Sequence, residues 1–235
     1  MKYLTIFIIF LFQCLPALAG QQQFMGQTAR KNASSDPYQQ IIAYHNCDAL
    51  GDLVKATGSA TVTYGASVAL DEVAPIVGTG SWGNANTAWQ TVSIPISGNV
   101  DFDSGSIGFY VHLNELNSGG GIVSSNGGDF LFELYASSYT RFNLTYKGSN
   151  INTLVHGMAS GGRYFISLVF NGGDCTVYVN GASVGGITGA GGAIDDTDLN
   201  FWQYGTSTVC DMTVDQFISS DEATDVYSLR DITTF

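Results

Sequence analysis

Short runs in which apolar and polar residues alternate recur along most of the chain. From Ile41 onward they are separated by glycine-rich or asparagine-rich stretches, and the sequence between them shows no amphipathic helical pattern of ten or more residues. This pattern predicts antiparallel strands joined by tight turns, in a sandwich or barrel. The predicted strands cover residues 60–70, 89–96, 106–113, 130–135, 141–146, 164–170, 175–181, 199–205 and 211–219.

The alternation also predicts which side chains face the core. In residues 141–146, Phe142, Leu144 and Tyr146 share one face of the strand, because successive side chains point to opposite sides. We expect that face to be buried and the other to meet solvent. Only residues 221–229 look like a brief helical turn.

The first residues predict export. A lysine, an apolar run over residues 4–12 and a small-x-small pattern at residues 17–19 are typical of a cleaved signal peptide, here residues 1–19. Residues 20–40 are polar and aperiodic, which predicts a flexible N-terminal segment. Residues 41–235 are expected to form one domain that is secreted, periplasmic or at the cell surface. No later apolar run is long enough for a membrane span.

The chain is acidic, with 8 basic and 20 acidic residues and a net charge of −12. Such a surface argues against nucleic acid and anionic membranes as partners, since both require clustered Lys and Arg. Acidic polysaccharide is disfavoured too, unless calcium bridges it. Hydrophobic residues make up 45% of the chain and glycine occurs 29 times, so a sizeable core with many tight turns is expected.

Several of these runs match motifs of a known group. The predicted hairpin at residues 163–181 reads RYFISLVFNGGDCTVYVNG, and its Tyr178, Asn180 and Gly181 stand where the group has a Tyr-Val-Asn-Gly turn. On these motifs, residues 41–235 resemble the laminin G-like jelly-roll domains of the concanavalin A-like lectin/glucanase superfamily. The resemblance implies an all-β, antiparallel two-sheet β-sandwich. It leaves function open, because this fold hosts adhesive, sugar-binding and enzymatic proteins.

The cysteines allow one disulfide. Beyond the signal peptide the chain has Cys47, Cys175 and Cys210, an odd number that permits any one of three pairs and leaves one thiol. The resemblance implies that the first and last strands are neighbours. It therefore favours a disulfide between Cys47 and Cys210 over one between Cys175 and Cys210.

Our main functional hypothesis is a non-catalytic carbohydrate-binding or adhesive domain whose partner is a polysaccharide or glycoconjugate. A sugar site needs a planar aromatic side chain to stack on a pyranose ring, with amides or carboxylates for the hydroxyl groups. In residues 199–205, Asn200, Trp202 and Tyr204 share one predicted strand face. Trp82, in a loop rich in glycine and asparagine, is a second candidate.

An enzyme is the first alternative. A polysaccharide lyase on this fold would need a tyrosine or histidine base and an arginine, and Tyr110, His112 and Arg141 are the candidates, with Tyr135, Asn143 and Tyr178 as further residues of suitable type. The strand motifs typical of alginate lyases are absent from the sequence.

A glycoside hydrolase is less favoured. The E-x-D-x-x-E run of related glucanases is missing, and the nearest pair, Asp129 and Glu133, would be about 13 Å apart along a strand, too far for retaining chemistry. A third alternative is a structural surface or matrix protein that binds another extracellular protein.

Calcium is the cofactor to consider. Exported sandwiches bind it through loop carboxylates and backbone carbonyls, and residues 193–200 cluster Asp195, Asp196 and Asp198. The sequence therefore predicts a calcium site in this loop, although each aspartate equally suits a turn or cap.

Overall fold

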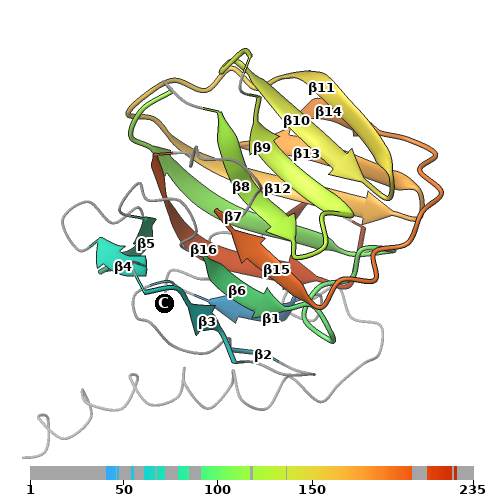
Figure 1. Ribbon diagram of the computed structural model, residues 1–235, viewed down its shortest axis with the longest axis horizontal. Helices are drawn as coiled ribbons and strands as arrows, with labels where there is room; N and C mark the ends of the chain where they lie inside the picture. Colours follow the sequence, from blue (N-terminus) through green and yellow to red (C-terminus); the bar gives the residue numbers. More distant parts are fainter. Residues whose placement is uncertain are drawn as a thin grey trace, which may run out of the picture. The chain divides into compact units, whose positions relative to one another are not determined.

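The computed structural model describes residues 41–45, 47, 54–55, 61–66, 68–71, 79–84, 91–116, 119–135, 137–202, 211–223 and 225–226. All of them belong to one compact unit, Gln40–Phe235. Residues 1–19 and 20–40, predicted as signal peptide and flexible segment, lie outside the described residues. The described chain is almost entirely β and forms two antiparallel sheets, as the sequence predicted (Figure 1).

The larger sheet has nine strands among the described residues. Its path runs β14-β13-β12-β7-β16-β1-β2, and β5 also pairs with β16 and carries β4. The strands are β1 (Ile41–His45), β2 (Val54–Lys55), β4 (Val68–Asp71), β5 (Ser81–Asn84), β7 (Ser106–Leu113), β12 (Arg163–Asn171), β13 (Asp174–Val179), β14 (Ala182–Ile187) and β16 (Met212–Ser220).

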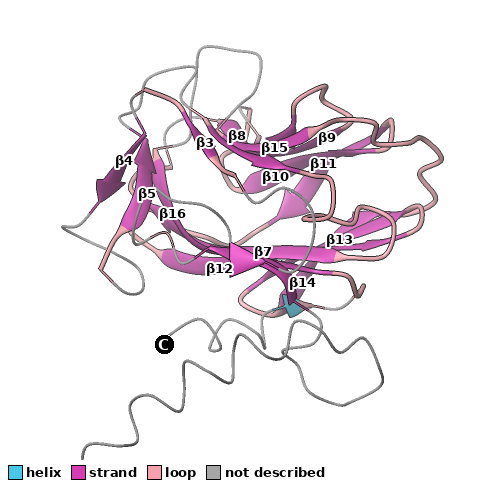
Figure 2. Cartoon of the chain, turned by 90° about the horizontal axis from the view of Figure 1, so that it is seen from below, coloured by secondary structure: helices cyan, strands magenta, loops and turns pink. Residues whose placement is uncertain are grey.

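The second sheet has seven strands in the described part of the chain, in the order β11-β10-β9-β8-β15-β6-β3. They are β3 (Thr63–Tyr64), β6 (Val92–Pro95), β8 (Gly120–Ser125), β9 (Phe130–Leu134), β10 (Arg141–Tyr146), β11 (Ser149–Val155) and β15 (Asp198–Phe201). Figure 2 shows the two sheets as separate layers, with β7, β12 and β13 in one and β8, β9 and β10 in the other.

The core lies between the layers, and the alternation predicted it correctly. Phe142, Leu144 and Tyr146 of β10 are buried, while the intervening side chains are exposed or half-buried. Phe201 lies at the centre of the aromatic packing. The centroid of its ring is 5.1 Å from that of Phe109, and it also packs against Trp82, Phe217 and Trp202.

Two expectations about strands were wrong. Residues 60–70 form not one strand but two, β3 and β4, in different sheets, because the chain turns where the Val68 N–H donates to the Gly65 carbonyl at 3.0 Å. Trp82 lies not in a loop but in β5, which pairs with β16. Glycine and asparagine around Trp82 hid the strand from a pattern based on alternation.

The outer face of the nine-stranded sheet is partly covered by the chain itself. Val226 packs there with Phe165 and Ile218, and a Cβ placed on Gly108 would lie 2.5 Å from Val226 Cγ2. Ser167 Oγ donates a hydrogen bond to Asp225 beside this cluster. In the predicted helical turn, Val226 is the one described residue with helical conformation. This cluster therefore removes part of the outer face of the nine-stranded sheet from contact with a ligand.

Candidate functional site

Polar side chains form ordered rows on the outer face of the seven-stranded sheet. Residues paired between antiparallel strands point to the same side of a sheet, so each row follows from the register. One row crosses six strands and consists of Ser93, Asn200, Ser124, Leu131, Thr145 and Asn150. Leu131 is its one apolar member, and Asn200, Ser124 and Leu131 in the middle of the row are buried. The next row pairs Glu133 with Asn143, and the third places Tyr135 opposite Arg141, whose carbonyl accepts from the Tyr135 N–H at 2.9 Å.

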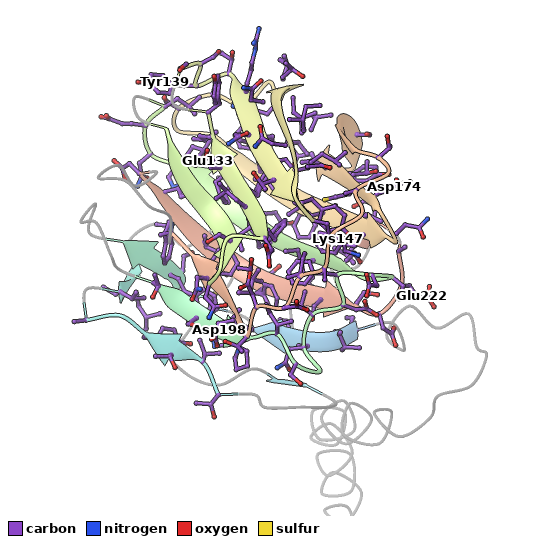
Figure 3. The ribbon with its side chains drawn as sticks, turned by 45° about the vertical axis from the view of Figure 1, so that its right-hand side comes forward. Glu133, Tyr139, Lys147, Asp174, Asp198 and Glu222 are labelled. Atoms are coloured by element: carbon purple, nitrogen blue, oxygen red, sulfur yellow. The ribbon has the colours of Figure 1, made fainter. Side chains whose placement is uncertain are left out.

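Four of these side chains are joined by hydrogen bonds. Asn143 Nδ2 donates to Glu133 Oε1 at 2.6 Å, and Asn150 Nδ2 donates to Asn143 Oδ1 at 2.9 Å and to Thr145 Oγ1 at 2.8 Å. All four remain half-buried or exposed. We call them, together with Tyr135 and Arg141, the polar face. In Figure 3, Glu133 lies on the sheet between the ends marked by Tyr139 and Asp198.

The Glu133 carboxylate is held in an unfavourable environment. Burial raises the pKa of Glu133 above its ordinary value of 4.5, and the hydrogen bond from Asn143 opposes part of that rise. A carboxylate with a raised pKa on an outward sheet face is a candidate for a functional position.

Glu133→Gln is therefore expected to stabilise the protein at neutral pH. In the wild type, the folded chain holds the Glu133 proton more tightly than the unfolded chain does. Protonation of Glu133 therefore stabilises the folded wild type fully below the ordinary pKa, and this stabilisation is lost as the pH rises through the raised pKa. Glutamine keeps an acceptor for Asn143 and carries no charge. Denaturation between about pH 4 and pH 8 should show a flatter profile for the variant. A variant less stable than the wild type at neutral pH would contradict this account.

A buried histidine fixes the loop at one end of the polar face. His156 Nδ1 accepts from the Met158 N–H at 2.9 Å, so its proton is on Nε2, which donates to the Tyr139 carbonyl at 2.8 Å. Burial lowers the pKa of His156, which keeps the ring neutral. The ring also packs against Phe142, 4.6 Å between centroids. The turn that leads into Arg141 is thus tied to the core.

The described residues of the aromatic sites predicted from the sequence are not exposed. Trp202 is 2% exposed, Trp82 0% and Asn200 3%, so neither indole offers a free face to a sugar ring. The prediction for Trp202 was wrong because the strand ends at Phe201. Trp202 has a φ of 61°, and its ring packs against Phe201. Tyr204 lies outside the described residues.

The residues of the enzymatic alternative are not brought together. Tyr110 and His112 lie on β7 of the nine-stranded sheet, and the Tyr110 ring packs edge-on against Phe165 at 4.9 Å. Arg141 lies on β10 of the other sheet. The structure instead places Arg141 beside Tyr135 and Asn143, a grouping that the sequence could not reveal without the strand register.

The predicted calcium loop is held by hydrogen bonds. Asp196 Oδ2 accepts from the Asp129 N–H at 3.4 Å and Asp198 Oδ2 accepts from Thr197 Oγ1 at 2.7 Å, while Asp195 is exposed. Within the described ranges, no group of three or more His, Cys, Asp or Glu side chains is arranged to hold a metal ion. Calcium binding by this loop stays a prediction.

The predicted disulfide between Cys47 and Cys210 stays a prediction, because Cys210 lies outside the described residues. Cys47 is buried beside β1. Cys175 carries a free thiol in the core, and burial raises its pKa, so the thiolate is disfavoured there.

Comparison with known proteins agrees with this architecture. Residues 83–217, more than half of the chain, match the family model described as concanavalin A-like lectin/glucanases superfamily, of laminin G type. The chain therefore belongs to this superfamily, as the motifs indicated. No curated protein matches the chain in sequence. In the described residues, no helix is long and apolar enough to cross a membrane.

Solved structures show the same fold at low sequence identity. A Trypanosoma rangeli sialidase in complex with 2,3-difluorosialic acid matches with a TM-score of 0.63 and 12% identity, over 92% of this chain and 38% of the sialidase. The binding domain of botulinum neurotoxin DC, in complex with rat synaptotagmin II, matches with a TM-score of 0.60 and 17% identity. The match covers 83% of this chain and 51% of the neurotoxin chain. A structure of botulinum neurotoxin type C, whose cell entry is described as dependent on two ganglioside molecules, matches with a TM-score of 0.59 and 17% identity. The match covers 83% of this chain and 50% of the neurotoxin chain. The chain spans half or less of most of these proteins, and the likeness concerns the fold.

Proposed function

We propose that this chain binds carbohydrate, without cleaving it, through the polar face of the seven-stranded sheet. The observation that carries the proposal is the hydrogen-bonded set of Glu133, Asn143, Thr145 and Asn150 on an outward, accessible surface. Amides, hydroxyls and a carboxylate in fixed positions are the groups that recognise sugar hydroxyls. Superfamily membership and sugar-binding proteins of the same fold support this assignment.

Tyr135 is the proposed stacking residue in place of Trp202. It is half-buried and lies opposite Arg141. These two residues form the row beside the pair of Glu133 and Asn143. A tyrosine ring held in this way presents an apolar surface beside polar groups, the combination that a pyranose ring requires. The predicted signal peptide would bring the face into contact with external glycans.

The placement of carboxylates favours binding over hydrolysis. Glu133 and Asp198 are labelled well apart on the sheet in Figure 3. From the register, Glu133 is four residue positions from Asp198 along the strand direction and two strands from it across the sheet, a separation of roughly 16 Å. Paired carboxylates in glycosidases are about 5–9.5 Å apart. These two therefore do not form an acid and nucleophile pair.

Asn143→Ala is expected to weaken glycan binding about tenfold, because it removes an amide that contacts the sugar and that also positions Glu133 and Asn150. Native gels that contain a panel of polysaccharides, run over a concentration series, give the dissociation constants. The matched control is Asn171→Ala, the same substitution at an exposed position on β12 of the other sheet.

The same panel separates the alternatives. Equal retardation of the Asn143→Ala variant and the wild type would remove the polar face from the proposal. No retardation by any polymer would favour a domain that binds another protein. Release of reducing ends or of unsaturated products from a polymer would support a hydrolase or a lyase.

A further inference from the structure

We infer that the polar face selects uncharged glycans over sialylated, uronic or sulfated ones; this inference rests on the proposed function. Uncharged glycans are thus the proposed ligand class of the polar face. The inference follows from the hydrogen-bonding capacity that the four linked side chains leave unused and from the charges around them.

The unused hydrogen-bonding capacity of the network contains both acceptors and donors. Both Asn150 N–H groups are used, by Asn143 and Thr145, so its unused hydrogen-bonding atom is the acceptor Oδ1. Among the described residues, Glu133 Oε2 has no donor, which leaves a second and stronger acceptor. The remaining donors are one N–H of Asn143 and the Thr145 hydroxyl. Sugar hydroxyls, which both donate and accept, match this mixture, whereas a carboxylate or sulfate needs donors alone.

Positive charge near the face is limited to one side chain. Of the described arginine and lysine side chains, Arg141 alone lies on this face, and it is about 7 Å diagonally from Glu133, whose charge opposes its own. Lys147 is turned away, since its Nζ bonds Asp103 and the Gly172 carbonyl, and Arg163 lies on the other sheet. The chain as a whole carries −12. Both the local and the overall field therefore disfavour an anionic ligand.

The inference separates this chain from proteins of similar fold. One such protein is described with a sialic acid derivative and another with gangliosides. At 12–17% identity the likeness does not extend to site residues. A face that carries the Glu133 carboxylate next to its single arginine repels a sialic acid carboxylate more than a neutral sugar, so the two kinds of ligand are distinguishable by experiment.

The test compares polymers that share a backbone and differ in charge. Suitable pairs are methyl-esterified and de-esterified polygalacturonan, hydroxyethyl and carboxymethyl cellulose, and dextran and dextran sulfate. The wild-type chain should bind the neutral member of at least one pair about tenfold more tightly than its charged member, and added NaCl should leave the neutral binding unchanged. Glu133→Gln should bring the two affinities closer together, because it removes the negative charge from the face.

Each outcome is informative. Equal or tighter binding of the charged members, or neutral binding that weakens with salt, overturns the inference and leaves glycan binding in place. A lack of binding to every polymer, or binding that Asn143→Ala does not change, overturns the proposed function itself. A Glu133→Gln variant whose preference matches that of the wild type would show that this carboxylate does not determine selectivity.

Discussion

Phe201→Ala is expected to lower the free energy of unfolding by about 3–5 kcal/mol, the usual cost of removing a buried aromatic ring. Phe201 is fully buried, and its ring packs against Trp82, Phe109, Trp202 and Phe217 from both sheets. The cavity left behind would be lined by large rings that cannot collapse into it. Chemical denaturation followed by tryptophan fluorescence measures the change.

Val155→Ala is the control for Phe201→Ala. Val155 lies on β11 of the same sheet and is 59% exposed, so its truncation should cost about 0.5 kcal/mol or less. If Phe201→Ala does not fold, Phe201→Leu retains most of the volume and should fall between the two. Equal effects at Phe201 and Val155 would show that the core does not centre on Phe201.

Trp202→Ala is expected to destabilise the protein by a similar amount, about 3–5 kcal/mol, because the indole is a core side chain. A large loss of stability would support the core role of Trp202 over the stacking role that the sequence predicted. Trp202→Phe should be much milder, since Trp202 Nε1 has no hydrogen-bond partner among the described residues and phenylalanine keeps a ring. Denaturation curves, together with glycan binding measured on folded protein, check both variants. An Ala variant of full stability that has lost glycan binding would restore the stacking role.

The sequence predicted most of the fold through alternation. Residues 106–113 and 141–146 became β7 and β10 with the predicted bounds, and the buried faces followed from a period of two. Prediction failed where a local backbone change interrupts that period. At Trp202 a positive φ ends the strand, so counting onward from Leu199 and Phe201 placed the indole on the wrong side.

The polar face was only partly predictable. Alternation placed Asn143 and Thr145 on the outer face of their strand, but nothing in the local pattern paired them with Asn150. Asn150 lies on β11, whose pairing with β10 has a register shift between Ile151 and Leu154. This shift interrupts the alternation of side chains along β11. Glu133 was considered as half of a catalytic pair, and its actual neighbour, Asn143, is set by strand pairing between residues ten apart in the chain.

The hydrogen bonds among Glu133, Asn143 and Asn150 also bear on the thermodynamics of recognition. Side chains already confined to one rotamer lose little conformational entropy when a ligand arrives, whereas mobile ones lose about 0.5–1.5 kcal/mol each. At the proposed site, a sugar that fits this arrangement would meet preordered side chains, and a sugar that differs in one hydroxyl orientation would require them to rearrange. The proposed site would therefore discriminate between epimers through an order that exists before any sugar binds.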